Sequence, residues 1–261
     1  MGRRHHGGLA LNGWLAIHKE SGMTSTRVVE QVRSILRANK AGHGGTLDPF
    51  AEGLLPVAMG SATKTLGLVL EGDKSYQCWV RFGLETDTDD CTGKPLWETG
   101  NYPTLEDLQA VLPEFTGTIQ QVPPIYSAIR VDGDRAYHLA RRGEVLDLPA
   151  RTVHIHRLEL VDYVEGLACF HIDSSKGTYI RALARDLGRK LGTAGHLQKL
   201  IRTRTLGFTL QQAVTLDQLR QEAAGDGWRQ WMFPVDRVLD GIPALRLENM
   251  AWNQAQNGQT V

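Results

Sequence analysis

Apolar residues along this chain follow helical spacing in some segments and alternate in others. In residues 25–40 they recur three or four positions apart, from Val28 to Leu36. This spacing predicts an amphipathic helix, and Ser25 at its start is a candidate N-cap. The glycine-rich stretch 41–53 follows directly, and we interpret it as a loop.

Two further segments show the alternation that is typical of strands. Residues 75–82, "SYQCWVRF", alternate apolar and polar positions, and "LACFHIDS" (167–174) is a second candidate strand. A helical stripe follows from Ile180 to Leu191 and ends at Gly192, and residues 215–224 predict a short helix. Since strands and helices mix without a regular βαβ rhythm, the pattern predicts an α+β fold.

Length and composition indicate an ordinary globular protein. The chain has 261 residues, of which 41% are hydrophobic, and it contains no apolar run near the ~20 residues that a membrane span needs. Asn12 and Gly13 interrupt the apolar part of the N-terminal segment, so no export signal is predicted. We therefore expect a cytoplasmic protein without membrane contact, and a monomer.

Neither the cysteines nor the paired histidines predict a metal site. Cys78, Cys91 and Cys169 are scattered, which fits reduced thiols in the core better than a disulfide framework or a zinc site. His154 and His156 alternate in a candidate strand without a nearby third ligand, so we interpret them as an exposed strand face.

Charge is segregated along the chain although the net charge is zero. From Lys176 to Arg204 there are eight Lys and Arg but one acidic residue, and the predicted helix 27–40 carries four against one. Acidic residues gather instead in "ETDTDD" (85–90). Such segregation can produce a positive face that binds nucleic acid. The alternative is that these side chains simply solvate helix surfaces.

The stretch "GHGGTLDPFAEG" (42–53) is the strongest candidate for chemistry. Pro49 favours an extended backbone at Asp48, and Gly44 and Gly45 leave room beside that carboxylate for a ligand. With His43 and Lys64 nearby in sequence, an ionised Asp48 could act as a nucleophile or an electrostatic stabiliser. The alternative is a capped turn, for which Asp-Pro is a common dipeptide.

Five ordered motifs settle this choice by resemblance. "GHGGTLDPFAEGLLPVAMGSATK" (42–64) resembles the signature of the TruB family of pseudouridine synthases, and segments 12–25, 73–93, 121–144 and 174–192 resemble its other motifs. Departures from the family pattern include Gly44 in place of Thr and Glu20 in place of Pro.

The resemblance implies a fold and an activity. The fold is the pseudouridine synthase fold, a mixed, largely antiparallel central sheet flanked by helices. We expect a catalytic domain over 1–235, with an RNA-binding excursion at about 124–150, and a short, incomplete PUA-like segment over 236–261. The implied reaction is isomerisation of uridine-55 in the T loop of tRNA without cofactor or metal, and with neither guide RNA nor protein partner.

The resemblance also assigns residues. Asp48 matches the catalytic aspartate, Arg181 the arginine that pairs with it, and Tyr76 the tyrosine that stacks on uracil and is a candidate for moving the C5 proton. Three further residues match the family's contacts to the flipped uridine: His43, Tyr179 and Leu200. The basic run 176–204 and the helix at 27–40 would hold phosphates. Without the resemblance, the tyrosines could be core aromatics, and Arg181 could pair with Asp173 or Asp186.

Three other functions compete with this interpretation. Guide-RNA-dependent relatives of the dyskerin type share the fold but carry a complete PUA domain. A non-catalytic tRNA-binding or tRNA-folding protein could keep the same fold, although Asp48, Tyr76 and Arg181 are all retained. A glycosidase would need a second carboxylate, and the loop offers only Glu52.

Overall fold

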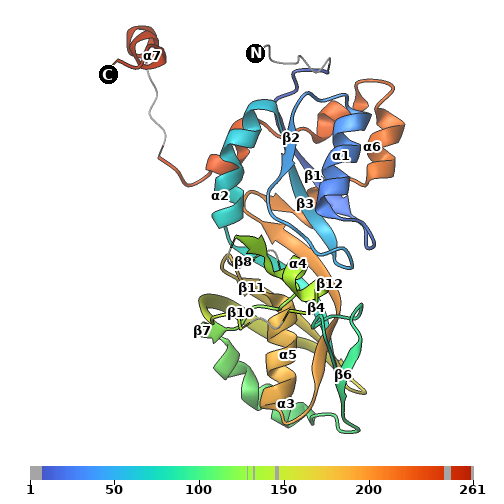
Figure 1. Ribbon diagram of the computed structural model, residues 1–261. Coiled ribbons are helices and arrows are strands. Elements are labelled where there is room, and N and C mark those ends of the chain that lie inside the picture. The colour runs from blue at the N-terminus through green and yellow to red at the C-terminus, as the bar shows by residue number, and fades with distance from the viewer. Residues whose placement is uncertain (1–7, 128, 132, 145–146, 244–247, 260–261) are drawn as a thin grey trace.

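The computed structural model (Figure 1) describes residues 8–127, 129–131, 133–144, 147–243 and 248–259. The strands are β1 (Gly13–Lys19), β2 (Ala41–His43), β3 (Glu52–Met59), β4 (Lys74–Phe82), β5 (Leu84–Thr86), β6 (Pro95–Glu98), β7 (Gly117–Gln121), β8 (Arg130–Val131), β9 (Asp134–Arg135), β10 (Arg151–Val164), β11 (Leu167–Ser174), β12 (Gly195–Thr205) and β13 (Phe208–Thr209). The α-helices are α1 (Ser25–Ile35), α2 (Leu66–Glu71), α3 (Leu105–Val111), α4 (Ala136–Arg141), α5 (Ile180–Lys190), α6 (Leu216–Glu222) and α7 (Asn249–Gln256). Short 3₁₀ helices are η1 (Gly60–Thr65), η2 (Leu112–Phe115), η3 (Leu210–Gln212), η4 (Gly227–Trp231) and η5 (Val235–Leu239).

One large sheet organises the described residues. Seven strands follow the order β1–β3–β12–β4–β11–β10–β7, while β2 pairs with β3 and β13 with β12. The neighbours are antiparallel except β12 and β3, which pair in parallel at Ile201–Glu52 and Arg202–Gly53. The predicted α+β fold with a mixed, largely antiparallel sheet is confirmed.

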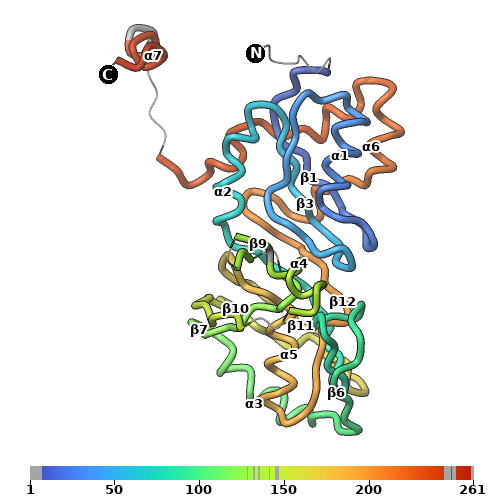
Figure 2. Tube along the Cα trace, viewed as in Figure 1, coloured from blue at the N-terminus to red at the C-terminus, as the bar shows by residue number. Residues whose placement is uncertain are grey.

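The chain folds into an upper half and a lower half, as the trace in Figure 2 shows. The upper half contains β1–β3, α1, α2 and α6, and the lower half contains β7, β10, β11, α3 and α5. Strand β12 runs from the lower half into the upper half, where it joins β4 to β3. One apolar core lies under β4 and α5, and two others lie on either side of the β1–β3 pair. Loops of the upper half therefore meet the start of α5 at the junction.

Most of the predicted elements are present with nearly the predicted bounds. Strands β4 and β11 match 75–82 and 167–174, and α5 and α6 match the two predicted helices. In β4, the side chains of the apolar set from Tyr76 to Phe82 are buried, as alternation requires. Stretch 41–53 is not entirely loop, because β2 and β3 occupy its two ends.

The predicted cap of α1 is wrong by one residue. Thr24 is the N-cap, and its hydroxyl accepts a hydrogen bond from the Arg27 N–H at 3.1 Å. Ser25 is buried, and its hydroxyl bonds the backbone of Leu47 instead, accepting from N–H at 2.8 Å and donating to the carbonyl at 3.0 Å. The helix ends at Ile35, two residues before Arg37 takes a positive φ of 51°.

The excursion and the C-terminal segment lie outside the large sheet. Residues 124–150 leave β7 and return at its neighbour β10, with β8, β9 and α4 between them. Residues 128, 132, 145 and 146 of the excursion, and residues 244–247 of the C-terminal segment, lie outside the described residues. Helix α7 belongs to the C-terminal segment and stands apart from the body in Figure 1. Among the helices described, none is long and apolar enough to cross a bilayer.

Candidate active site

The loop that carries Asp48 (residues 44–51, here the Asp48 loop) is tied down at both ends. Gly44 N–H donates to the Pro56 carbonyl at 2.8 Å. Beyond Asp48, the Gly22 N–H donates to the Pro49 carbonyl at 2.8 Å. Ser25 holds Leu47 in the middle of the loop, so the Asp48 side chain, 34% exposed, projects from a fixed backbone.

Gly44 provides close packing within the protein and not the room for a ligand that the sequence suggested. A Cβ at this position would lie 2.6 Å from Cγ1 of Val69 on α2, so a larger residue here would require Val69 to shift. Gly45 is needed for its backbone, because its φ is +116°.

Arg181 pairs with Asp48, as the resemblance implied, and not with Asp173 or Asp186. Arg181 Nε lies 2.9 Å from Asp48 Oδ2, and Nη2 donates to Oδ1 at 3.3 Å. The Nε–H bond does not point toward Asp48 Oδ2, so the shorter contact is an ion pair and not an aligned hydrogen bond. The guanidinium is only 5% exposed and also donates to two carbonyls, at 2.9 Å to Thr88 and 3.0 Å to Tyr126.

Asp90 is a second carboxylate at this arginine, and sequence reasoning missed it. Its Oδ2 lies 3.6 Å from Arg181 Nη1, and its Oδ1 accepts from the hydroxyls of Thr88 and Thr92 at 2.8 and 2.6 Å. The signal that could have identified Asp90 is its place in the motif at 73–93, because the acidic composition of 85–90 alone gives it no role. Arg181 is therefore held between a partly exposed and a buried aspartate.

Tyr76 and Leu200 lie on one face of the sheet beneath the Asp48 loop. Tyr76 is buried on β4, and Leu200 on β12 lies opposite its neighbour Cys78. Burial raises the pKa of the Tyr76 hydroxyl, with a smaller contribution from Asp48, while Arg202 opposes the rise. The phenol is therefore neutral at neutral pH.

His43 lies at the end of β2 in the upper half, and Tyr179 lies at the start of α5 in the lower half. Burial, together with the nearby Arg202, lowers the pKa of His43, so its ring is neutral, and its Nδ1 is buried without a hydrogen-bond partner. Tyr179 occupies the N-cap position of α5, where the Gln121 side chain bonds both its N–H and its carbonyl. The Arg151 guanidinium lies 5.3 Å from the centre of the Tyr179 ring.

Three buried cations surround the loop, and none of them forms an ion pair within the described chain. Lys19 donates to the carbonyls of Pro49 and Ala51 at 3.1 and 2.5 Å, and Arg202 bonds the other end of the loop. Lys74 bonds the carbonyls at the end of α2. Burial lowers the pKa of Lys19 and of Lys74 from 10.5 to about 8. Sequence reasoning missed all three as parts of the site.

The predicted positive face over 176–204 is largely neutralised. Acids from distant parts of the chain pair with seven of its eight basic residues, and the eighth, Arg202, is buried. Along α5, Arg185 pairs with Asp89 and Arg189 with Glu85. The run thus binds the acidic stretch 85–90 within the protein, and it does not form an unpaired surface for phosphates.

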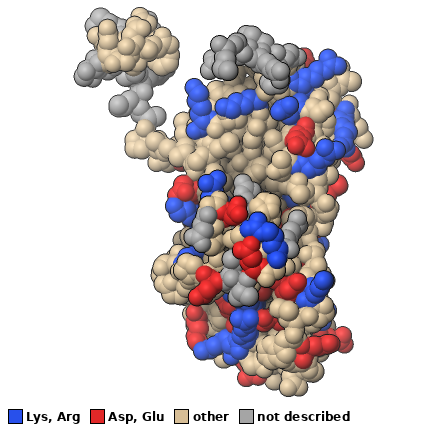
Figure 3. All heavy atoms as spheres, in the orientation of Figure 1, with Lys and Arg blue, Asp and Glu red and all other residues tan. Residues whose placement is uncertain are grey.

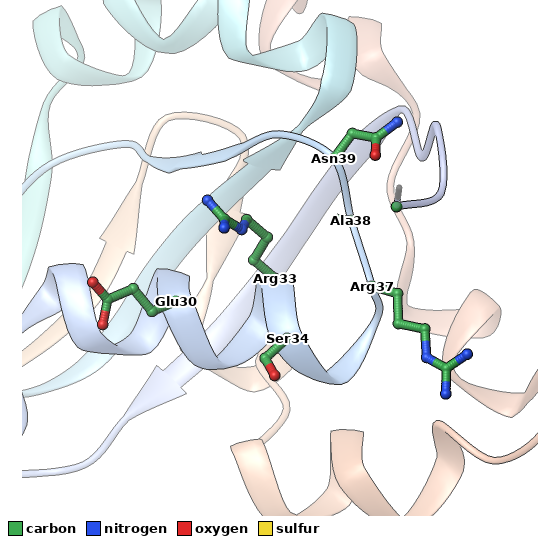
Figure 4. A pocket seen from close by; sticks show the side chains of 7 residues that line it. Glu30, Arg33, Ser34, Arg37, Ala38 and Asn39 are labelled. Carbon is green, nitrogen blue, oxygen red and sulfur yellow. The ribbon is translucent and has the colours of Figure 1, made fainter. Parts of the chain in front are cut away.

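The basic residues at the end of α1 are different. Arg33 and Arg37 line a hollow of about 510 Å³ and, within the part of the chain described, form no ion pair. Figure 4 shows their guanidinium groups pointing away from each other beside this hollow. On the face shown in Figure 3, most charged residues of the upper half are Lys and Arg, whereas acidic and basic residues are mixed over the lower half. The positive region predicted for 27–40 is therefore open to solvent.

The remaining predictions concern cysteine and histidine. Cys78 and Cys169 are buried, but Cys91 is exposed, so the prediction of three core thiols fails at Cys91, where a turn follows Asp90. His154 and His156 do share the exposed face of β10, where His154 bonds the Thr118 hydroxyl and His156 pairs with Asp73.

Comparison with known sequences finds one family over most of the chain. The N-terminal domain of TruB family pseudouridylate synthases matches residues 33–180, and the C-terminal domain of tRNA pseudouridylate synthase B matches 181–240. A tRNA pseudouridine synthase B of Bradyrhizobium diazoefficiens is 46% identical, over 96% of this chain and 74% of its own length. That of Gluconacetobacter diazotrophicus is 44% identical, over 99% of this chain and 85% of its own length.

Solved structures support the same fold. A chain of a Cbf5–Nop10–Gar1 complex superposes with a TM-score of 0.76 at 28% identity, covering 94% of this chain and 67% of that one. A chain of an archaeal box H/ACA Nop10–Cbf5 complex gives 0.73 at 25% identity, covering 97% and 69%.

Proposed function

Since this chain belongs to the TruB family of pseudouridylate synthases, we propose that it converts uridine-55 in the T loop of tRNA to pseudouridine without a cofactor. It acts in the cytoplasm, as a monomer and without a guide RNA. The observation that carries the proposal is the Asp48–Arg181 pair, which sits at the junction of the two halves next to a neutral tyrosine.

The reaction needs little more than this pair. The C1′–N1 bond of the uridine breaks, the base turns, and a C1′–C5 bond forms, while the proton on C5 is lost and N1 gains one. Since no group enters or leaves, one carboxylate acting as nucleophile can carry the rearrangement. Arg181, which also contacts Asp90, fixes the direction of the Asp48 carboxylate and favours its ionised form.

The surrounding residues suit a base that has left its stack. Extruding a nucleotide costs a few kcal/mol, and stacking on Tyr76 returns ~1–3 kcal/mol. Leu200 supplies an apolar contact on the same face of the sheet, and neutral His43 adds no charge near the base. Tyr179, at the start of α5, is proposed as a further contact to the nucleotide.

The rest of the chain is proposed to hold the RNA. The catalytic domain is 1–235, and its excursion at 124–150 is an RNA-binding arm whose base Arg181 fixes through the Tyr126 carbonyl. Segment 236–261 is proposed to be PUA-like. Relatives 42–46% identical carry the name tRNA pseudouridine synthase B, against 28% identity to the Cbf5 chain, which favours tRNA itself as the substrate.

The decisive experiment compares wild type with Asp48→Asn on an unmodified tRNA transcript. We expect pseudouridine at position 55 with wild type, none with Asp48→Asn, and equal tRNA binding by both. Asp217→Asn, on the exposed surface of α6, is the matched control and should remain active. Binding without product by wild type would contradict the proposal and favour a tRNA-folding protein.

A further inference from the structure

Arg202 is a buried charge that the proposed chemistry has not used. Its residue is 1% exposed on β12, and no carboxylate of the described chain forms an ion pair with it. Burying a cation without a counter-charge is expensive, and it persists only where other groups satisfy it. The groups that do so here all belong to the candidate active site.

The guanidinium binds the backbone of both the Asp48 loop and strand β3. Arg202 Nη2 donates to the Gly45 carbonyl at 3.0 Å, Nη1 to Thr46 at 3.4 Å and Nε to Leu54 at 2.9 Å. Gly45 and Thr46 lie three and two residues before Asp48. The planar fork of donors thus fixes the start of the loop against β3.

The backbone of Arg202 is fixed just as closely. A Cβ on Gly53, whose φ is +107°, would lie 2.5 Å from the Arg202 carbonyl oxygen. Glycine therefore allows β3 and β12 to pair in parallel at this point, opposite Gly53. The pairing of β3 with β12 therefore fixes the backbone from which the Arg202 side chain extends.

Arg202 also lies beside Tyr76, which is on the neighbouring strand β4. The two are register partners on β12 and β4, and the guanidinium lies close enough to the phenol oxygen to oppose the rise in its pKa. A guanidinium only donates, so the tyrosine oxygen can only accept from it, and the phenol proton points away from Arg202. Arg202 therefore decides which way the hydroxyl of Tyr76 points.

We propose that Arg202 is a positioning residue for the uridine isomerisation: it orients the Tyr76 hydroxyl and fixes the backbone that leads to Asp48. This inference rests on the proposed function. A phenol that moves the C5 proton must first give up its own proton, which N1 of the uracil accepts, and the resulting phenolate then takes the C5 proton on its oxygen to return to the phenol. A guanidinium beside the oxygen stabilises the phenolate, and it opposes the rise in the Tyr76 pKa caused by burial.

The test is a double-mutant cycle between Arg202→Met and Tyr76→Phe, read as the single-turnover rate of pseudouridine formation in a tRNA transcript. Arg202→Met should slow the reaction ~10²-fold, in the range found for loss of one preorganised donor, with tRNA affinity changed less than about twofold. In the Tyr76→Phe background the same change should slow it much less, because the hydroxyl is already absent. Thermal unfolding shows that each variant is folded.

Arg237→Met is the matched control, since Arg237 Nε also donates to a backbone carbonyl, that of Gly207 at 2.8 Å, outside the site. Its rate should equal that of wild type. If Arg202→Met does not fold, Arg202→Lys retains the charge, and it should be slow in the same Tyr76-dependent way. No loss in either background would overturn the inference, and an equal loss in both would overturn the role that it gives Arg202 in orienting the Tyr76 hydroxyl. An inactive wild type would instead overturn the proposed function beneath it.

Discussion

Single buried charges, and the groups that satisfy them, shape the candidate site at the residue scale. Arg181 makes contacts with Asp48, Asp90 and two backbone carbonyls, so its guanidinium has a single possible orientation. A lysine at this position would keep the charge but could not reach these partners together, because its ammonium is a compact point charge.

We therefore expect Arg181→Lys to lower the single-turnover rate by ~10²-fold, the typical effect of losing one preorganised donor. Tyr126 and Thr88 would lose a donor, so the melting temperature should also fall. The control is Arg220→Lys on α6, whose exposed pair with Asp217 should contribute little to either measurement. An Arg181→Lys rate equal to wild type would contradict this role for the guanidinium.

At the scale of elements, α5 and α1 use arginine for opposite purposes. Arg181, Arg185 and Arg189 lie one turn apart on α5, and each faces an acid of stretch 85–90. Helix α5 thus fastens this stretch to the site. In contrast, Arg33 and Arg37 at the end of α1 have no acidic partner in the described ranges and line an open hollow.

Helix α1 is therefore the element whose charge should bind tRNA. Reversing Arg33 and Arg37 together to Glu should weaken tRNA binding several-fold and lower the salt dependence of the dissociation constant by about 1–2 in log–log slope. The single-turnover rate at saturating tRNA should not change. Arg220→Glu together with Arg229→Glu, whose partners Asp217 and Asp226 are exposed, is the charge-matched control. An equal salt slope for wild type and for the variant with Arg33→Glu and Arg37→Glu would show that α1 does not contact the RNA.

At the scale of the whole molecule, buried lysines at the junction make stability depend on pH. Burial is the main cause that lowers the pKa of Lys19 and Lys74 to about 8 in the folded protein, from 10.5 in the unfolded chain. Between these values the unfolded chain holds protons that the folded protein has released. The stabilisation is complete above 10.5 and is lost as pH falls through about 8.

Chemical denaturation should therefore show this contribution as a free energy of unfolding that rises between pH 8 and 10. In Lys74→Met the rise should be smaller than in wild type, because one of the two groups no longer titrates. Lys64→Met, at an exposed position in η1, should keep the wild-type slope. Identical slopes for wild type and Lys74→Met would contradict the lowered pKa.

The sequence predicted those parts of the protein that depend on neighbours along the chain. Period-two alternation defined β4, period-3.6 stripes defined α5 and α6, and the motif around Asp48 indicated the site by resemblance. Such patterns report burial within a few residues of each position. They say nothing of which distant charge will face which.

Only the tertiary structure decided the pairings. Asp48 and Arg181 are 133 positions apart, and Asp90 completes the group from a third segment. The basic run 176–204 is neutralised by acids from other parts of the chain, so counting charges along the sequence predicted an exposed positive face that is absent from the described surface there. Whether a side chain solvates a surface, binds RNA or holds a loop depends on its burial and its partner, and both of these are fixed only when the upper and lower halves close on each other.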